Sequence, residues 1–190
     1  MSGLKRIHLH WTAGARKCSR YDREHYHFLI GGDGEIISGT KKPEANVDTR
    51  DGDYVAHTRA ANTGAIGVAV CGMLGAKERP FDPGPQPITA AQIEAMADLC
   101  IDLCETYEIP VTAKTVLTHA EVQTNLGIRQ RGKWDINWLP GWSMPRDPKS
   151  AGDEIRLVIL KRMRDEGSSY PKSHFQLRFD SFFRDNHGAS

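Results

Sequence analysis

The feature that most constrains the fold is a continuous apolar run, AIGVAVCGM, at residues 65–73. Its residues are small, apolar or β-branched, and polar residues do not alternate with them. A strand with one solvated face alternates apolar and polar residues, so this pattern is typical of a strand that is buried on both faces. We therefore expect residues 65–73 to form a central strand of a sheet.

Three further segments have the pattern of strands. Residues 4–12, LKRIHLHWT, alternate in a way that suits a strand, and a small-residue turn follows them. In residues 25–40, HYHFLIGGDGEIISGT, an apolar run meets the turn GGDG and then resumes, which predicts a β-hairpin. The pattern of residues 111–117 predicts one more strand, and His119 follows just after its end.

Two segments have the period of amphipathic helices. Thr89 to Gln92 has the form of a capping box, and apolar residues then recur at three- to four-residue spacing over about 18 residues. A second helix is expected over residues 150–167, where Gly167 ends it. Helices that accompany a buried central strand predict an α/β fold, with a single mixed central β-sheet flanked by helices.

Length and charge limit the functional classes. The 190 residues suit one main domain at 1–149, a helix at 150–167 packed on it, and an aromatic-rich tail at 168–190. Charged residues make up 26% of the chain with a net charge of +1, which gives no electrostatic reason to expect nucleic acid as a partner. We expect the protein to be a monomer.

The sequence also limits location and redox state. No apolar run approaches the length of a transmembrane helix, and the first residues lack the apolar core of a signal peptide. We expect synthesis in the cytoplasm without a signal peptide and without membrane insertion. The four cysteines are too sparse for a disulfide framework, so we expect reduced thiols.

The stretch LTHAEVQTNLGIRQRGKWDINWLPG at residues 117–141 carries the candidate chemistry. His119 and Asp135 are both suitable metal ligands, and a catalytic zinc site takes about three such ligands and leaves one position for water. Lys133 lies two residues before Asp135, so the two side chains share a face if the segment is extended. A third ligand must come from elsewhere in the chain.

The predicted strand at residues 4–12 supplies the candidate third ligand. His10 stands near its end, where α/β folds place ligand sites. His8 has the same parity along the strand, so the spacing alone leaves it as an alternative.

Several motifs together resemble one known family: HWTAG at 10–14, HYHFLIGGDGEI at 25–36, AHTRAANTGAIGVAVCGM at 56–73, and LTHAEV with GKWDINWLPG. Over about residues 4–145 the chain is similar to N-acetylmuramoyl-L-alanine amidases of the type 2 amidase and peptidoglycan-recognition-protein fold, especially phage and prophage members. The resemblance implies that residues 1–149 are a zinc amidase domain. It implies Zn²⁺ as the cofactor, peptidoglycan as the partner, and an endolysin-like role at the bacterial cell wall.

The same resemblance implies roles for individual residues. His10, His119 and Asp135 match the zinc ligands of the family. Tyr26 matches its catalytic tyrosine, and Lys133 matches the lysine two residues before the third ligand. The expected substrate-binding residues are His57, Thr58, Asn62, His27 and Trp11.

The sequence departs from the family pattern at two places. The muropeptide-recycling branch carries a glutamate on the strand that corresponds to residues 66–72, and this chain has none there, so the Tyr26 branch is the better match. Fifteen residues separate His119 from Asp135, which is longer than in short phage enzymes. We expect residues 123–131 to form an added loop at the rim of the groove.

Two alternatives stay open on the sequence. A non-catalytic peptidoglycan-binding module of the same fold would lack a metal ligand, whereas all three candidate ligands are present here. A partner-binding protein would act through the tail at residues 168–190, in which aromatic and apolar residues alternate as they do in a strand.

Overall fold

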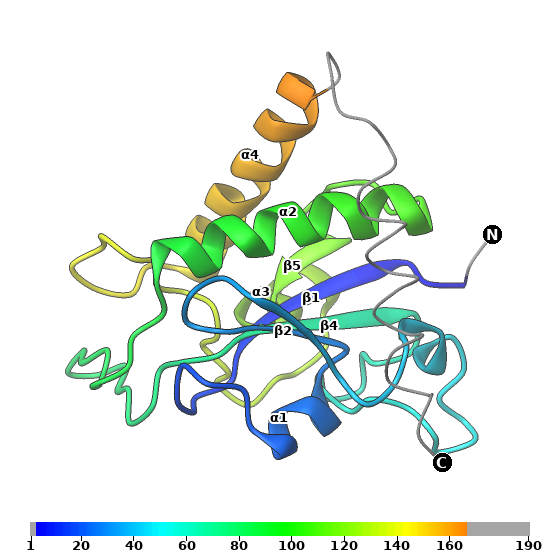
Figure 1. The fold of residues 1–190 in the computed structure, drawn as a ribbon, viewed down its shortest axis with the longest axis horizontal. Coiled ribbons are helices and arrows are strands. Elements are labelled where there is room, and N and C mark those ends of the chain that lie inside the picture. Colours follow the sequence, from blue (N-terminus) through cyan, green and yellow to red (C-terminus); the bar gives the residue numbers. More distant parts are fainter. Residues whose placement is uncertain (1–2, 167–190) are drawn as a thin grey trace.

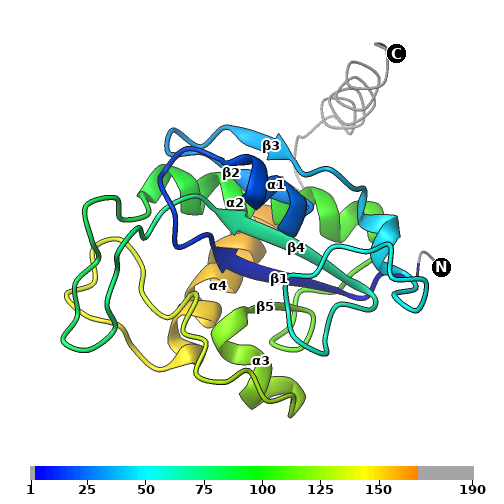
Figure 2. The same cartoon turned by 90° about the horizontal axis from the view of Figure 1, so that it is seen from below.

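The computed structural model describes residues 3–166, and the predicted tail at 168–190 lies outside them. The described chain forms a five-stranded sheet in the order β3-β2-β4-β1-β5 (Figures 1 and 2). The strands are β1 (Arg6–Trp11), β2 (Phe28–Ile30), β3 (Ile36–Ser38), β4 (Ala65–Val70) and β5 (Val116–Thr118). β3 is antiparallel to β2 and the other pairs are parallel, which confirms the prediction of a single mixed sheet.

Strand β4 lies between β1 and β2, as its apolar sequence predicts. Every residue of β4 is buried. Helices α2 (Ala90–Tyr107) and α4 (Pro148–Glu166) lie on one face of the sheet, and α1 (Arg20–His25) lies on the other (Figures 1 and 2). Removing the apolar side chains of a two-sided sheet from water is the main favourable contribution to the stability of such a fold.

Helix α2 confirms both the predicted capping box and the predicted length, since it spans 18 residues. Gln92 is buried within its first turn, and its side-chain amide donates to the carbonyl oxygens of Ile30 and Cys71 at 2.9 and 2.7 Å. These two hydrogen bonds tie the start of α2 to the carboxyl ends of β2 and β4.

The predicted hairpin over residues 25–40 is confirmed by the antiparallel pairing of β2 with β3. The predicted strand over residues 111–117 is too long, because β5 begins only at Val116. The backbone N–H of Thr112 donates to the hydroxyl of Thr115 at 3.0 Å, so a local turn satisfies the polar groups that a strand would have paired.

Helix α4 begins two residues before the predicted start, at Pro148. Proline suits the first helical position, and Asp147 caps the helix by accepting the backbone N–H of Ser150 at 3.2 Å. Helix α1 spans only six residues, which is too short for a helical period to show in the sequence. The sequence feature that marks the start of α1 is the capping box that Ser19 forms with Asp22.

Helix α3 (His119–Leu126) follows β5 without a connecting loop, so His119 is the first residue of a helix. The expectation of a loop over residues 123–131 is therefore wrong for 123–126, which form the last turn of α3. Gly127 ends the helix in the left-handed region, at φ 72°, where glycine has no Cβ to clash.

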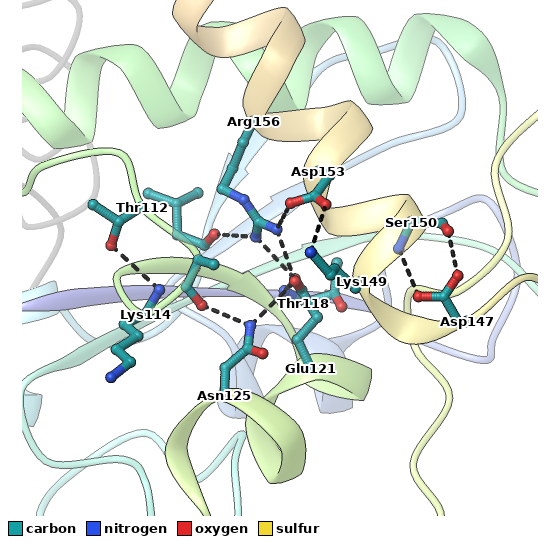
Figure 3. Close-up of polar contacts among 12 residues, drawn as sticks. Thr112, Lys114, Thr118, Glu121, Asn125, Asp147, Lys149, Ser150, Asp153 and Arg156 are labelled. Carbon is teal, nitrogen blue, oxygen red and sulfur yellow. Dashed lines mark hydrogen bonds and ion pairs between the residues drawn. The ribbon is translucent and has the colours of Figure 1, made fainter.

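A buried ion pair joins α4 to the first turn of α3 (Figure 3). Arg156 donates to both carboxylate oxygens of Glu121, at 2.8 and 3.0 Å, and to the carbonyl of Val116 at 2.9 Å. Glu121 also accepts the backbone N–H of Thr118 at 2.9 Å. Gly152 allows this approach, because a methyl group there would collide with the Glu121 carboxylate. Helix α4 thus holds the junction of β5 and α3.

Two further findings concern membrane-spanning helices and disulfide bonds. None of the helices within residues 3–166 is long and apolar enough to cross a membrane. All four cysteines are free thiols, as predicted; Cys71, Cys100 and Cys104 are buried and Cys18 is partly exposed. The fold is therefore held without a disulfide bond.

Replacing Arg156 with methionine should destabilise the protein by about 3–5 kcal/mol, because the Glu121 carboxylate would stay buried without its counter-charge. Urea unfolding followed by circular dichroism measures this change. Arg164→Met is the matched control, since Arg164 is exposed on the same helix, and it should change the free energy of unfolding by less than about 0.5 kcal/mol. Equal changes in the free energy of unfolding for the two substitutions would show that the Arg156–Glu121 ion pair does not stabilise the fold.

Candidate metal centre

Parallel pairing of β1 with β5 brings two histidines together at one edge of the sheet. Leu9 of β1 pairs with Thr118 of β5, so the next residues, His10 and His119, are neighbours at the carboxyl end of both strands. Their ring centroids are 4.7 Å apart and the rings are nearly perpendicular. This is the edge at which α/β sheets bind ligands.

Asp135 completes a group of three side chains. Its Oδ2 atom lies 2.9 Å from Nδ1 of His10 and 3.1 Å from Nδ1 of His119. The exposed fractions of His10, His119 and Asp135 are only 1%, 4% and 7%. Within the part of the chain that the structure describes, no other group of three or more histidine, cysteine or acidic side chains could hold a metal ion.

Two contacts outside the group fix the segment that carries Asp135. The carbonyl of Asp135 accepts the backbone N–H of Ala120 at 2.6 Å, which ties it to the start of α3. The ring of Trp134 packs edge-on against Trp11 of β1, with the centroids 4.7 Å apart. Asp135 is therefore anchored to both elements that carry the two histidines.

The environment sets the protonation states that metal binding requires. Burial lowers the pKa of His10 to about 4, although its hydrogen bond to Asp135 acts in the opposite direction. Burial alone would raise the pKa of Asp135, but the hydrogen bonds from His10 and His119 outweigh burial and hold it below its usual range. At neutral pH His10 is thus neutral and Asp135 ionised, the forms in which these side chains bind metals.

The second ring nitrogen of each histidine also has a buried partner. Nε2 of His119 lies 2.9 Å from Oε1 of Gln130, and Nε2 of His10 lies 3.3 Å from the hydroxyl of Thr58. Such outer partners orient metal-binding histidines and select the nitrogen that faces the ion.

Thr58 also separates His10 from the alternative ligand His8. Its hydroxyl lies 3.0 Å from Nδ1 of His8 and 2.9 Å from Nδ1 of His57. One hydroxyl can donate one hydrogen bond and accept two, so its contacts with three histidines use all of its hydrogen-bonding capacity. Because His8 faces Thr58 and lies outside the three-residue group, the geometry favours His10 as the third ligand.

Tyr26 lies beside the group, with its ring centroid 5.2 Å from that of His10. Burial, followed by the charge of Asp135, raises the pKa of the Tyr26 hydroxyl. The phenol therefore stays protonated at neutral pH and can donate a hydrogen bond. Lys133 is exposed, and its positive charge is among the causes that lower the pKa of His10.

The five expected substrate-binding residues differ in exposure. Trp11, His27 and Thr58 are buried, with exposed fractions of 5%, 1% and 1%. The side-chain oxygen of Asn62 accepts the backbone N–H groups of His57 and Thr58, so it shapes the turn that positions Thr58. Contact with a substrate stays a prediction for all five residues, of which His57 and Asn62 are partly exposed.

Sequence reasoning misses two residues that support the group. Glu121 has a recognisable signal, because Thr118 to Glu121 reads as a capping box in front of a helix. Gln130 has none, since no motif or period marks a glutamine in a polar segment. Its role becomes visible only when the chain brings it back to His119.

The donor set fits zinc. Two imidazole nitrogens and one carboxylate oxygen are typical ligands of catalytic zinc, which takes about three protein ligands and keeps one position open. His10, His119 and Asp135 are the residues that could hold the ion.

Comparison with known proteins identifies a family. A family model described as N-acetylmuramoyl-L-alanine amidase matches residues 2–141. That range contains the three candidate ligands together with Tyr26 and Lys133, and it excludes α4. No match is found among curated proteins.

Solved structures give a weaker likeness. One is N-acetylmuramoyl-L-alanine amidase LysC from Clostridium intestinale URNW, 18% identical over 83% of this chain and 87% of that chain, with a TM-score of 0.49. Another is the Ph2119 endolysin from Thermus scotoductus MAT2119 bacteriophage Ph2119, 16% identical over 80% and 84%, with a TM-score of 0.49. A third is the Drosophila peptidoglycan recognition protein SD, 19% identical over 74% and 83%, with a TM-score of 0.45.

His119→Ala should abolish zinc binding, because the two remaining side chains hold an ion too weakly. Zinc content after dialysis, measured by plasma mass spectrometry, should fall from about one ion per chain to near none. His25→Ala is the control, since His25 contacts the carbonyl of Tyr21 and lies outside the group. Undiminished zinc in His119→Ala would place the metal elsewhere.

Proposed function

The chain belongs to the N-acetylmuramoyl-L-alanine amidase family, and on this premise we propose that it cleaves the amide between N-acetylmuramic acid and L-alanine in peptidoglycan with the help of zinc. We also propose an endolysin-like role, in which this cleavage degrades the bacterial cell wall. The observation that carries the proposal is the buried group of His10, His119 and Asp135. A binding module that had lost catalysis would have no need to keep all three candidate metal ligands.

The chemistry that zinc supplies at such a site is polarisation of the scissile carbonyl and activation of the attacking water. His10 and His119 would hold the ion through Nδ1, and Asp135 would hold it through its carboxylate. This leaves the catalytic roles around the ion to Tyr26 and Lys133.

Tyr26 and Lys133 would act on the reacting groups. Burial raises the pKa of Tyr26, which favours the protonated hydroxyl as a hydrogen-bond donor that orients water or the reacting carbonyl. The ammonium of Lys133 would stabilise the negative charge that develops on the carbonyl oxygen. Its exposure lets it reach a substrate from the rim of the site.

An amide is a better fit than a glycosidic bond. Glycoside hydrolysis commonly needs two carboxylates that flank the sugar oxygen. The candidate centre offers one carboxylate, Asp135, and both histidines already bind it. The partly exposed His57 and Asn62 and the segment after α3 are the groups that we expect along the sugar and the stem peptide.

Digestion of purified peptidoglycan should release intact stem peptides with a free L-alanine amino terminus and leave the glycan strands uncut. Mass spectrometry of the soluble products identifies the bond, and a parallel digestion with a chelator tests the need for metal. New reducing sugar ends, or peptides cut within the stem, would contradict the proposed bond. Full activity after chelation, with zinc loss verified, would contradict the role of zinc.

Lys133→Ala should lower kcat by on the order of a hundredfold while zinc content stays unchanged, because the lost interaction belongs to the transition state. Initial rates on a soluble muramyl peptide, together with metal analysis, separate these two effects. Lys114→Ala removes another exposed lysine and should leave the rate unchanged. A normal rate in Lys133→Ala would show that its ammonium does not contact the reacting carbonyl.

A further inference from the structure

We propose that Gln130 is a positioning residue of the metal centre, which fixes the ring of His119 so that Nδ1 faces the ion. This inference rests on the proposed zinc function and deepens it. It also gives a role to residues 127–131, the part of the predicted 123–131 loop that is not helical.

The amide of Gln130 has only one orientation that satisfies its neighbours. Its NH₂ group donates to the carbonyl of Arg59 at 2.9 Å and to the carbonyl of Ile128 at 3.2 Å. Carbonyl oxygens only accept, so the nitrogen side of the amide must face them. Oε1 is then the atom that faces His119, at 2.9 Å from Nε2. The side chain is 4% exposed, so water does not offer an easy alternative partner.

This orientation selects the tautomer of His119. An amide oxygen cannot donate, so the hydrogen bond requires a proton on Nε2 of His119. Zinc at Nδ1 would take the place of the proton that Nδ1 shares with Asp135, so the ring would keep its proton on Nε2 and offer the lone pair of Nδ1 to the ion. Nδ1 is the nitrogen that lies 3.1 Å from Oδ2 of Asp135, on the side of the three-residue group. Gln130 therefore determines which nitrogen of His119 is available to the ion.

The rest of the segment is built to hold Gln130 in place. The chain turns back from α3 at Gly127, and Gln130 then donates its backbone N–H to the side chain of Gln123 at 3.0 Å. Ile128 packs against a small buried cluster that contains Leu117 and Val122. These contacts bring a residue eleven positions after His119 back to its ring.

Gln130→Met keeps the length of the side chain and removes its hydrogen bonds. We expect the zinc dissociation constant, measured by competition with a chelator, to rise by about 10–100-fold, the usual effect of losing an outer partner of a ligand. Gln123→Ala is the matched variant, because it loosens the same segment and leaves Oε1 of Gln130 facing His119. It should weaken zinc binding by less than about threefold.

A spectroscopic signature tests the proposal without any substitution. Nitrogen-15 resonances of the zinc-loaded protein should show His119 with zinc on Nδ1 and a proton on Nε2, and this proton should exchange slowly with water. Zinc on Nε2 would overturn the proposal even if Gln130→Met did not fold. Equal weakening by Gln123→Ala and Gln130→Met would also overturn it, because loop order and not the hydrogen bond would then matter.

Different results would contradict zinc binding by the chain and the role of Gln130. A wild-type chain that binds no zinc would contradict the proposed function itself. Unchanged zinc affinity in Gln130→Met, with normal amide hydrolysis by the wild type, would contradict only the role of Gln130.

Discussion

The site depends on one buried carboxylate oxygen. Oδ2 of Asp135 lies within hydrogen-bond distance of both His10 and His119, which come from the end of β1 and the start of α3. A buried carboxylate is costly unless hydrogen bonds satisfy it, and here the two imidazoles do so. The same atoms are suited to binding a metal. The contacts that make the buried charge tolerable are therefore also the contacts that assemble the donor set.

Several outer groups hold this arrangement, and each comes from a different part of the chain. Thr58 contacts His10 from the loop before β4, and Gln130 contacts His119 from the segment after α3. Arg156 of α4 forms an ion pair with Glu121, and this pair holds the first turn of α3 (Figure 3). Because the family match ends at residue 141, α4 lies beyond it, yet it stabilises the helix that carries a candidate ligand.

Much of this could be predicted from the sequence, because the relevant signals are local. The apolar run of β4, the hairpin of β2 and β3, and the capping box of α2 each follow from neighbouring residues, and the structure confirms them. The position of His10 near a strand end also pointed to the edge of the sheet where His10, His119 and Asp135 lie together. The parity that His10 shares with His8 left the two open on spacing alone, and the contact of His10 with Asp135 adds a difference that the sequence does not show.

What the sequence could not show depends on contacts between distant segments. The early end of β5 results from a hydrogen-bonded threonine turn, and the helical start at His119 depends on Glu121, which Arg156 holds from α4. Gln130 lacks any sequence pattern, because its function comes from the return of the chain to His119. Long-range partners of this kind become visible only when the fold is known.

The most direct test of the central claim is a crystal structure of the zinc-loaded protein with anomalous diffraction measured on both sides of the zinc absorption edge. The account predicts one zinc peak at about 2.0–2.2 Å from Nδ1 of His10, Nδ1 of His119 and a carboxylate oxygen of Asp135. A peak bound by His8 or His57, a peak on the Nε2 side of either ligand histidine, or no peak among the three residues would contradict it.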